Sequence, residues 1–273
     1  MVKINTNIAA LTADRNLNLV SDALSVSTQR LSSGLRINLA KDDSAGLVIS
    51  EKLRAQIRAT EQASRNTQDG ISLIQTADGA LDNIHSALQR IREWTVQAAN
   101  GIVDTAQRSD IDGEINQLLD AIDRIATTTR YSNLTLFATS PSQQIDLQVG
   151  GSGGERLSLT LSDMRSAALG ISGLPLATTS DANASIGLID AAIDQVSSQR
   201  AALGGAQEAL EGISKNLDQA AENLRSSESR IRDLDVADET VSLTKWQILS
   251  QSATAVLAQA NVIPQNVLQL LRQ

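Results

Sequence analysis

Few residues in this chain could do covalent or metal chemistry, and their spacing does not support it. The 273 residues contain no cysteine, which excludes disulfides, thiolate nucleophiles and thiolate metal sites. His85 is the only histidine, and its position beside the apolar Ile84 favours a surface residue on a helix over a ligand. No motif pairs a nucleophile with a base. We therefore predict that the protein is not an enzyme and uses no cofactor or metal.

Two acidic clusters and one glycine-rich stretch are the remaining candidates for ligand binding. Asp42-Asp43 and the run from Asp233 to Glu239 lack the oxygen-ligand spacing of a calcium loop, so we interpret them as helix starts or solvated charges. The sequence GGSGGE at residues 150–155 lacks the Lys-Ser/Thr pair and the helix start that follow a phosphate-binding loop. Local structure explains these features better than binding does.

The glycine-rich stretch separates two segments in which apolar and polar residues alternate. The apolar members are Ile145, Leu147 and Val149 before it, and Leu157, Leu159 and Leu161 after it. Alternation on both sides of a glycine-rich turn predicts a β-hairpin near residues 145–161.

The composition of the rest of the chain favours long helices. Aromatic residues make up only 1% of it, less than a globular core of this size normally uses. Helix-favouring Ala, Leu, Gln and Arg are abundant, and only three prolines interrupt the chain. The net charge of −8 argues against a nucleic-acid partner, because such a protein needs a basic surface to neutralise phosphates.

Apolar or small residues recur at alternating steps of three and four between residues 53 and 98, as in the seam of a coiled coil. The seam changes phase near Gly70 and Gly79, and its second half is nearly unbroken: Ile74, Ala77, Leu81, Ile84, Leu88, Ile91, Thr95 and Ala98. A shorter repeat follows a turn at Gly101 and should fold back antiparallel: Ile111, Ile115, Leu118, Ile122 and Ile125.

A third repeat of this kind runs from Ile186 to Leu234, with no proline before Pro264. If the helix is continuous from about 183 to 258, it spans roughly 110 Å, whereas a compact globule of this length is about 50 Å across. The glycines within the run do not interrupt its register, so we favour a continuous helix. The predicted fold is mainly α: a long antiparallel helical coiled-coil rod with a small β-hairpin and paired terminal helices.

The two ends of the chain differ in composition from the middle. No charged residue occurs from Trp246 to Leu271, although 20% of the whole chain is charged. A transmembrane helix would leave the many amide and hydroxyl side chains of this stretch without partners in hydrocarbon, so we predict no membrane insertion. No secretory signal peptide is readable at the start of the sequence. A helix surrounded by protein on most sides explains the missing charge better.

Both ends carry apolar stripes with helical spacing, and we expect the two terminal segments to pair and to associate with other copies of the chain. A lone pair with Trp246 as its only aromatic anchor would bury little apolar area, so we also expect the ends to become ordered on assembly. The predicted self-association residues of the first segment are Ile4, Ile8, Leu11, Leu17, Leu24, Leu31 and Leu35. Those of the last segment are Leu249, Ala253, Val256, Ala260, Ile263, Leu268 and Leu271.

Specific stretches at both ends carry more than a shared periodicity. They are LSSGLRINLAKDDSAGLVISEKLRAQIR (31–58), NTQDGISLIQTADGAL (66–81), LQRIREWTVQAAN (88–100), ENLRSSESRIRDLDVADE (222–239) and LAQANVIPQNVLQLLRQ (257–273). These stretches resemble the two terminal regions of bacterial flagellins. Larger flagellins carry variable outer domains between these regions, and the short middle of this chain indicates a form without them.

The resemblance implies a structural subunit that polymerises into the extracellular filament of the bacterial flagellum for swimming motility. Residues 1–42 plus 233–273 would form the inner tube, and residues 43–232 the surrounding wall. The resemblance also implies export in the unfolded state through the flagellar secretion channel and assembly at the distal tip. The implied partners are other copies of the chain, the export apparatus, an export chaperone, and the filament cap and junction proteins. A hook–filament junction protein is the alternative, disfavoured because the ending LAQANVIPQNVLQLLRQ resembles that of a filament subunit.

One stretch of the flagellin wall is known as a surface that a toll-like innate immune receptor recognises. The matching residues in this chain are Leu88, Gln89, Arg90, Arg92, Glu93 and Glu114. Trp94 stands where the family usually has an aliphatic residue.

Overall fold

The computed structural model describes residues 6–138 and 142–270, without the side chains of 263–270. The helices of this part are α1 (Ile8–Ser33), α2 (Ser44–Ala98), α3 (Thr105–Thr128), α4 (Thr179–Arg232) and α5 (Val236–Leu270). The strands are β1 (Arg130–Tyr131), β2 (Leu134–Thr135), β3 (Ser142–Gln148) and β4 (Arg156–Ser162). The chain divides into two compact units, residues 1–55 plus 223–273 and residues 56–222. This confirms a mainly helical fold with a small β region.

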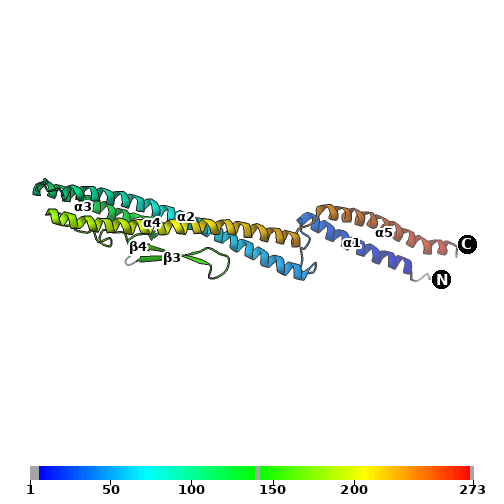
Figure 1. Ribbon diagram of the computed structural model, residues 1–273. Helices are drawn as coiled ribbons and strands as arrows, with labels where there is room; N and C mark the ends of the chain where they lie inside the picture. The colour runs from blue at the N-terminus through cyan, green and yellow to red at the C-terminus, as the bar shows by residue number, and fades with distance from the viewer. Residues whose placement is uncertain (1–5, 139–141, 271–273) are drawn as a thin grey trace. The chain divides into compact units, whose positions relative to one another are not determined.

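Within residues 56–222, helices α2, α3 and α4 lie side by side (Figure 1). Two ion pairs show that α4 runs antiparallel to α2: Arg92 Nε lies 2.7 Å from Asp190 Oδ1, and Arg200 Nε lies 2.9 Å from Asp78 Oδ1. The carboxylates of Asp190 and Asp78 raise the pKa of their arginine partners. The antiparallel arrangement follows the predicted seams.

The turn between α2 and α3 forms where the sequence predicts it. Asp104 caps α3: its Oδ1 accepts a hydrogen bond from Gln107 N at 2.8 Å, and the Gln107 side chain accepts one from Asp104 N at 3.2 Å. This reciprocal capping box satisfies two of the donors that a helix start leaves unpaired. The third helix can therefore begin at Thr105 and fold back along α2.

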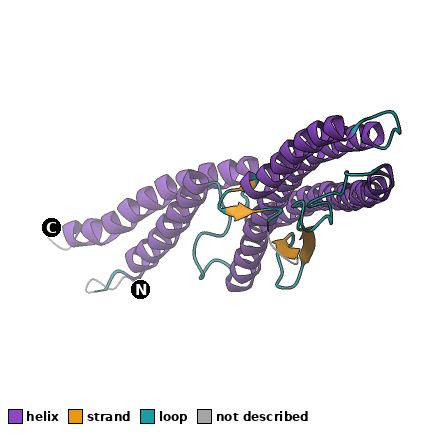
Figure 2. Ribbon diagram, turned by 90° about the vertical axis from the view of Figure 1, so that its left-hand side faces the viewer, coloured by secondary structure: helices purple, strands orange, loops and turns teal. Residues whose placement is uncertain are grey.

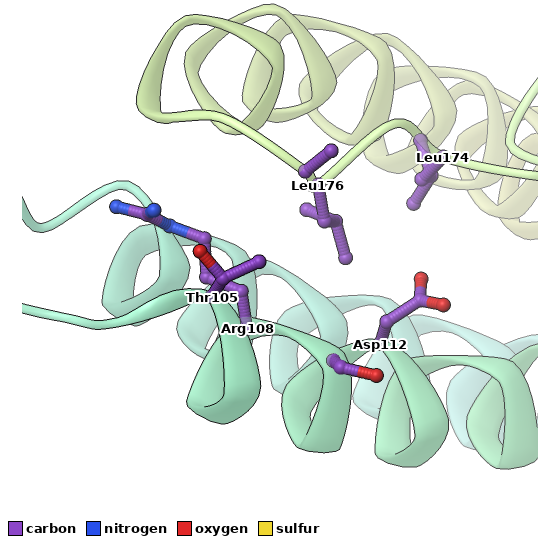
Figure 3. Close-up of a pocket in the computed structure, with 7 residues that line it drawn as sticks. Thr105, Arg108, Asp112, Leu174 and Leu176 are labelled. Atoms are coloured by element: carbon purple, nitrogen blue, oxygen red, sulfur yellow. The ribbon is translucent and has the colours of Figure 1, made fainter.

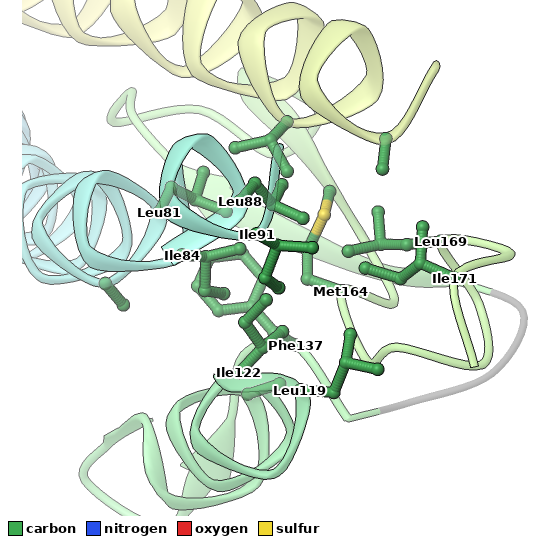
Figure 4. Packing of buried hydrophobic residues seen from close by; sticks show 14 of the residues in the cluster. Leu81, Ile84, Leu88, Ile91, Leu119, Ile122, Phe137, Met164, Leu169 and Ile171 are labelled. Atoms are coloured by element: carbon green, nitrogen blue, oxygen red, sulfur yellow. The ribbon is translucent and has the colours of Figure 1, made fainter. Parts of the chain in front are cut away.

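The hydrophobic core of this unit combines helical seams with irregular segments. Leu81, Ile84, Leu88 and Ile91 of α2 are fully buried, as the predicted seam requires. Figure 4 shows Phe137 between these residues and the α3 side chains. Beyond the helices, the core takes apolar residues from the segment that follows β4: Met164, Leu169, Ile171, Leu174 and Leu176.

The predicted β-hairpin is confirmed as β3 and β4, which pair antiparallel with Ile145 opposite Leu159. Figure 2 shows the strands beside the helices. Gly154 closes the turn with a φ of +107°, a conformation that only glycine adopts without strain. The glycine-rich sequence therefore has a turn-forming role.

The prediction of one continuous helix from about 183 to 258 is wrong. Helix α4 ends at Arg232 and α5 begins at Val236. The segment between them pairs with the segment after α1: Leu234 N donates to Gly34 O at 3.1 Å, and Arg36 N donates to Arg232 O at 2.7 Å. The side chain of Asp235 then accepts the N–H groups of the first turn of α5. These contacts replace the helical hydrogen bonds, and no proline or glycine in the break announces them.

Candidate self-association surface of the terminal helices

Helices α1 and α5 form an antiparallel pair in the unit of residues 1–55 and 223–273. At one end of the pair, Asn7 Nδ2 donates to Ala260 O at 2.8 Å, while its Oδ1 caps α1 by accepting from Ala10 N at 3.1 Å. At the other end, Ser27 Oγ donates to Glu239 Oε1. The predicted pairing of the terminal helices is therefore confirmed (Figure 1).

The seam of this pair, called the terminal seam below, follows alternating steps of three and four residues on both helices. Its members are at least partly removed from solvent. On α1 they are Ala10, Ala13, Leu17, Val20, Leu24, Ser27 and Leu31. On α5 they are Glu239, Leu243, Trp246, Ser250, Ala253, Leu257 and Ala260. Because many of these side chains are small, the seam buries little apolar area and the pair gains little stability from it.

Large apolar residues remain exposed on the same two helices, outside the terminal seam. Their exposed fractions range from 38% for Leu249 to 71% for Val241. We call this set the outer apolar face: Ile8, Leu11, Leu19, Val236, Val241, Ile248, Leu249, Val256 and Val262. An exposed apolar patch of this kind, where such side chains adjoin, typically marks a protein contact.

The structure divides the residues predicted for self-association into two groups. Those in the terminal seam are Leu17, Leu24, Leu31, Ala253 and Ala260, and those on the outer apolar face are Ile8, Leu11, Leu249 and Val256. Leu35 lies in the segment after α1, where it bridges Asp233. Ile4 and Leu271 lie outside the described residues, as do the side chains of Ile263 and Leu268.

Sequence reasoning missed Leu19, Val236, Val241, Ile248 and Val262 on the outer face. The predicted stripe of Leu249, Ala253, Val256 and Ala260 combines two residues of the terminal seam, Ala253 and Ala260, with two exposed residues beside it. The terminal seam itself continues through Trp246. A signal was available in the sequence, because apolar residues occupy more of α5 than one seam can bury.

Charged side chains cluster where α2 begins and α4 ends, and they become absent along α5 after Lys245. The Glu51 carboxylate accepts from Arg232 Nη1 at 2.6 Å and from Arg54 Nη1 at 3.0 Å, and these hydrogen bonds, that of Arg232 first, lower the pKa of Glu51. Along α5, the last charged residue is Lys245, whose ammonium group lies 5.2 Å from the ring centroid of Trp246. Beyond it, the described part of α5 presents apolar, amide and hydroxyl groups only, so association there requires no desolvation of charge.

The residues matched to the receptor-recognised surface lie on α2 and α3, and one of them requires a correction. Leu88 is fully buried in the core, so it is not a surface residue; its seam position on α2 turns it inward. Gln89, Arg90, Arg92, Glu93 and Glu114 are exposed. Trp94 is half-buried and packs against the core.

A hollow of about 310 Å³ lies beside the start of α3. Figure 3 shows Thr105, Arg108 and Asp112 of α3 facing Leu174 and Leu176 across it. The Arg108 guanidinium is held by its own chain: Nε donates to Ala98 O at 2.9 Å, and Nη2 donates to Thr179 Oγ1 at 3.0 Å. Its hydrogen bonds tie three helices together, so we interpret the hollow as a packing feature.

Within residues 6–138 and 142–270, no three His, Cys, Asp or Glu side chains gather closely enough to hold a metal ion. None of the helices, searched over the same residues, has an apolar run sufficient to cross a membrane.

Comparison with known proteins gives consistent matches at both ends of the chain. Residues 4–141 match the family model of the bacterial flagellin N-terminal helical region, and residues 186–271 match that of the C-terminal helical region. A flagellin of Halalkalibacterium halodurans is 46% identical over 98% of this chain and 99% of its own length.

Two solved structures are also similar. A Bacillus cereus flagellin is 32% identical in sequence and matches with a TM-score of 0.51. The match covers 56% of this chain and 88% of the Bacillus cereus chain. A Vibrio parahaemolyticus protein, described as a flagellar hook-associated protein, matches with a TM-score of 0.59. The match covers 70% of this chain and the whole of the Vibrio parahaemolyticus chain. At 14% identity, that second match shows a shared fold only.

Proposed function

Because the chain belongs to the bacterial flagellin family, it is a structural subunit of the flagellar filament and not an enzyme, and we propose that its outer apolar face is the surface through which copies associate. The main observation behind this proposal is that large side chains of α1 and α5, such as Leu11 and Val256, remain more than half exposed although the two helices pack against each other through the terminal seam. A second copy of the same chain supplies the apolar surface that these residues lack.

The energetic balance supports this proposal. Burying a Val, Leu or Ile side chain contributes about 1.5–3 kcal/mol, whereas association costs about 4–15 kcal/mol in lost freedom of motion. Several outer-face residues buried at once therefore offset that cost. A subunit contacting more than one neighbour would bury the face on several sides, which accounts for the absence of charge along α5 after Lys245.

The junction-protein alternative is not favoured. The fold of the Vibrio parahaemolyticus protein shows that helical architecture alone does not separate a filament subunit from a hook-associated protein. Similarity to a flagellin over nearly the full length of both chains does separate them. The protein is accordingly an extracellular component of the flagellum.

The partition into an inner tube and a surrounding wall is part of the proposal. Residues 1–42 plus 233–273 form the tube, and residues 43–232 form the wall. The helix break at 233–235 and the end of the linker before α2 support these boundaries, whereas the compact units divide within α2 and α4, after residues 55 and 222. The terminal helices would then change neighbours on assembly while the wall unit keeps its own core.

Unfolded export and growth at the distal tip are proposed on the same basis, with the export apparatus, an export chaperone, the cap and the junction proteins as partners. The terminal seam supports this step, because its alanines and serines are small and most of its larger side chains are only partly buried, so the pair is easily separated into single segments. A large aromatic core at the ends would resist that separation.

Recognition by a toll-like innate immune receptor is a separate proposal, supported by the exposure of Gln89, Arg90, Arg92 and Glu93 on one helix. An Arg90→Ala variant should weaken binding of the receptor ectodomain to the monomeric subunit. Arg124→Ala, at an exposed position of α3, is the control. Equal binding by both variants and the parent would remove this surface from consideration.

The assembly proposal is tested with Leu11→Ser and Val256→Ser, measured by the critical concentration for polymerisation. Each variant should raise the critical concentration about tenfold or more, since burial of one such side chain contributes at least 1.4 kcal/mol. Gln251→Ser, which removes a polar side chain from an exposed position of α5, should change it far less. Polymerisation of both apolar variants at the parental concentration would overturn the proposal.

A further inference from the structure

Glu239 is the one charged residue among the described members of the terminal seam. Its side chain is only 11% exposed; Oε1 accepts from Ser27 Oγ at 2.5 Å, and Oε2 lies 3.8 Å from Arg30 Nη1. Ser27 itself is 3% exposed. A carboxylate this far from water is tolerated only where donors and a counter-charge stand opposite it.

Outside the helices, the backbone hydrogen bonds of Leu234 with Gly34 and of Arg36 with Arg232 hold the end of α1 next to the start of α5. Within the helices, the other contacts of the pair recur and do not select one alignment. Asn7 donates to a backbone carbonyl, that of Ala260, and a helix offers such carbonyls on every turn. Counting inward from the two end contacts places Ala13 opposite Ala253. Sliding α5 by one heptad places Ala13 opposite Ala260, another alanine at an equivalent seam position.

The same slide is costly for Glu239. Moved in one direction, its carboxylate faces Val20 in the seam and has no donor there; moved in the other, it passes beyond the end of α1. In both cases Ser27 and Arg30 lose their acceptor. A single polar position in an otherwise apolar seam is known to specify the alignment of coiled coils in this way.

We propose that Glu239, through Ser27 and Arg30, is the side chain within the helices that sets the register of the α1–α5 pair, in the alignment that the backbone hydrogen bonds at the ends of α1 and α5 also hold. Register fixes which residues of the outer apolar face lie at the same height on the two helices, such as Leu11 and Val256. Glu239 thereby determines the pattern presented to a second copy; this last step rests on the proposed function.

The absence of cysteine from the chain allows register to be measured directly by cross-linking. A native reporter carries Ala13→Cys with Ala253→Cys, and a slipped reporter carries Ala13→Cys with Ala260→Cys. Both are treated as full-length free subunit, at concentrations below polymerisation, with a short bifunctional maleimide. Intramolecular cross-links are quantified by mass spectrometry, and helicity is followed by circular dichroism.

In the parent chain the native reporter should cross-link and the slipped reporter should not. With Glu239→Gln added, the ratio of native to slipped cross-links should fall about tenfold, as expected for the loss of a charge-assisted hydrogen bond. Asp238→Asn is the matched control, because it removes the same charge from an exposed position in the same first turn of α5. It should leave the ratio unchanged.

Two outcomes would overturn the inference. An unchanged ratio in Glu239→Gln would show that side-chain volume or the backbone pairing of residues 34–36 with 232–234 sets the register. Loss of both cross-links, with a loss of helicity by circular dichroism, would show that Glu239 holds the pair together without choosing its alignment. Polymerisation is then measured separately: the cross-link result stands whether or not the outer apolar face mediates assembly.

Discussion

Leu147 of β3 packs directly over Gly70 of α2. A Cβ atom on Gly70 would lie 2.7 Å from Leu147 Cδ1 and 3.2 Å from Leu210 Cδ1, closer than carbon atoms approach without displacement. Glycine at this position therefore lets the hairpin and α4 sit close to α2. The glycine that marks a change of phase in the sequence is a packing site in the structure.

Gly79 lies in the same helix with no atom within 4 Å of its would-be Cβ, so the two glycines form a matched pair. Gly79→Ala should stabilise the protein by about 0.5–1 kcal/mol, the helix-propensity difference. Gly70→Ala should stabilise less or destabilise, because Leu147 has to move. Urea denaturation compares the two variants, and equal gains would show that the hairpin does not pack tightly on Gly70.

Asp163 gives the stability a defined pH dependence. Its carboxylate accepts from Arg165 Nη2 at 2.6 Å and from Arg165 N at 3.1 Å, and the side-chain hydrogen bond from Arg165 holds the pKa of Asp163 below its usual value. A lowered pKa stabilises the fold above the pKa of the unfolded chain, about 3.9, and this contribution disappears as pH falls through the folded-state value.

Asp163→Asn should accordingly reduce the free energy of unfolding at pH 7 by about 1 kcal/mol, the low end for a charged hydrogen bond because Arg165 is 39% exposed. The difference from the parent should shrink as pH falls towards 3. Denaturant midpoints at the two pH values measure it. An equal difference at both would mean that packing, and not charge, accounts for the effect.

Arg108 joins α3 to the end of α2 and the start of α4 through its hydrogen bonds to Ala98 O and Thr179 Oγ1. Arg108→Met keeps the apolar stem and removes the donors, so it should cost about 1–3 kcal/mol of unfolding free energy. Arg108→Lys should recover less than half, because an ammonium group lacks the planar fork.

Arg124→Met, on the exposed side of α3, is the control for the Arg108 variants and should change the thermal midpoint little. If Arg108→Met and Arg124→Met unfold at the same temperature, Arg108 does not connect the three helices energetically.

The two units should differ in hydrogen exchange. In the free subunit, amides of α1 and α5 should exchange faster than those of α2 around Ile84 and Ile91, because the terminal seam buries fewer and smaller side chains. Polymerisation should slow exchange in α1 and α5 selectively. Equal protection of the terminal helices in monomer and polymer would contradict the proposal that assembly supplies their missing contacts.

Much of the fold is predictable because it follows from local periodicity. Alternation around the glycine-rich stretch correctly predicts the hairpin with Ile145 opposite Leu159, and steps of three and four correctly place Leu81, Ile84 and Ile91 in the core. The unusual lack of charge after Trp246 predicts that α5 is an association segment, without any coordinates. Each of these signals is carried by neighbouring residues.

Tertiary structure decided what depends on distant partners. Helix α4 ends at Arg232 because the next residues bond to the segment after Gly34, far away in sequence, and no local pattern encodes that contact. Phe137 and Met164 enter the core from segments without periodicity.

The sequence by itself determined that the ends of this protein are apolar, helical and poor in charge, and it carries the flagellin motifs. Only the tertiary structure decided which residues of α5 face α1 and which remain exposed. The terminal seam and the outer apolar face of α5 both carry apolar residues at helical spacing. The surface of α1 determines which of the two is covered. Glu239, meeting Ser27 and Arg30 there, belongs to that choice.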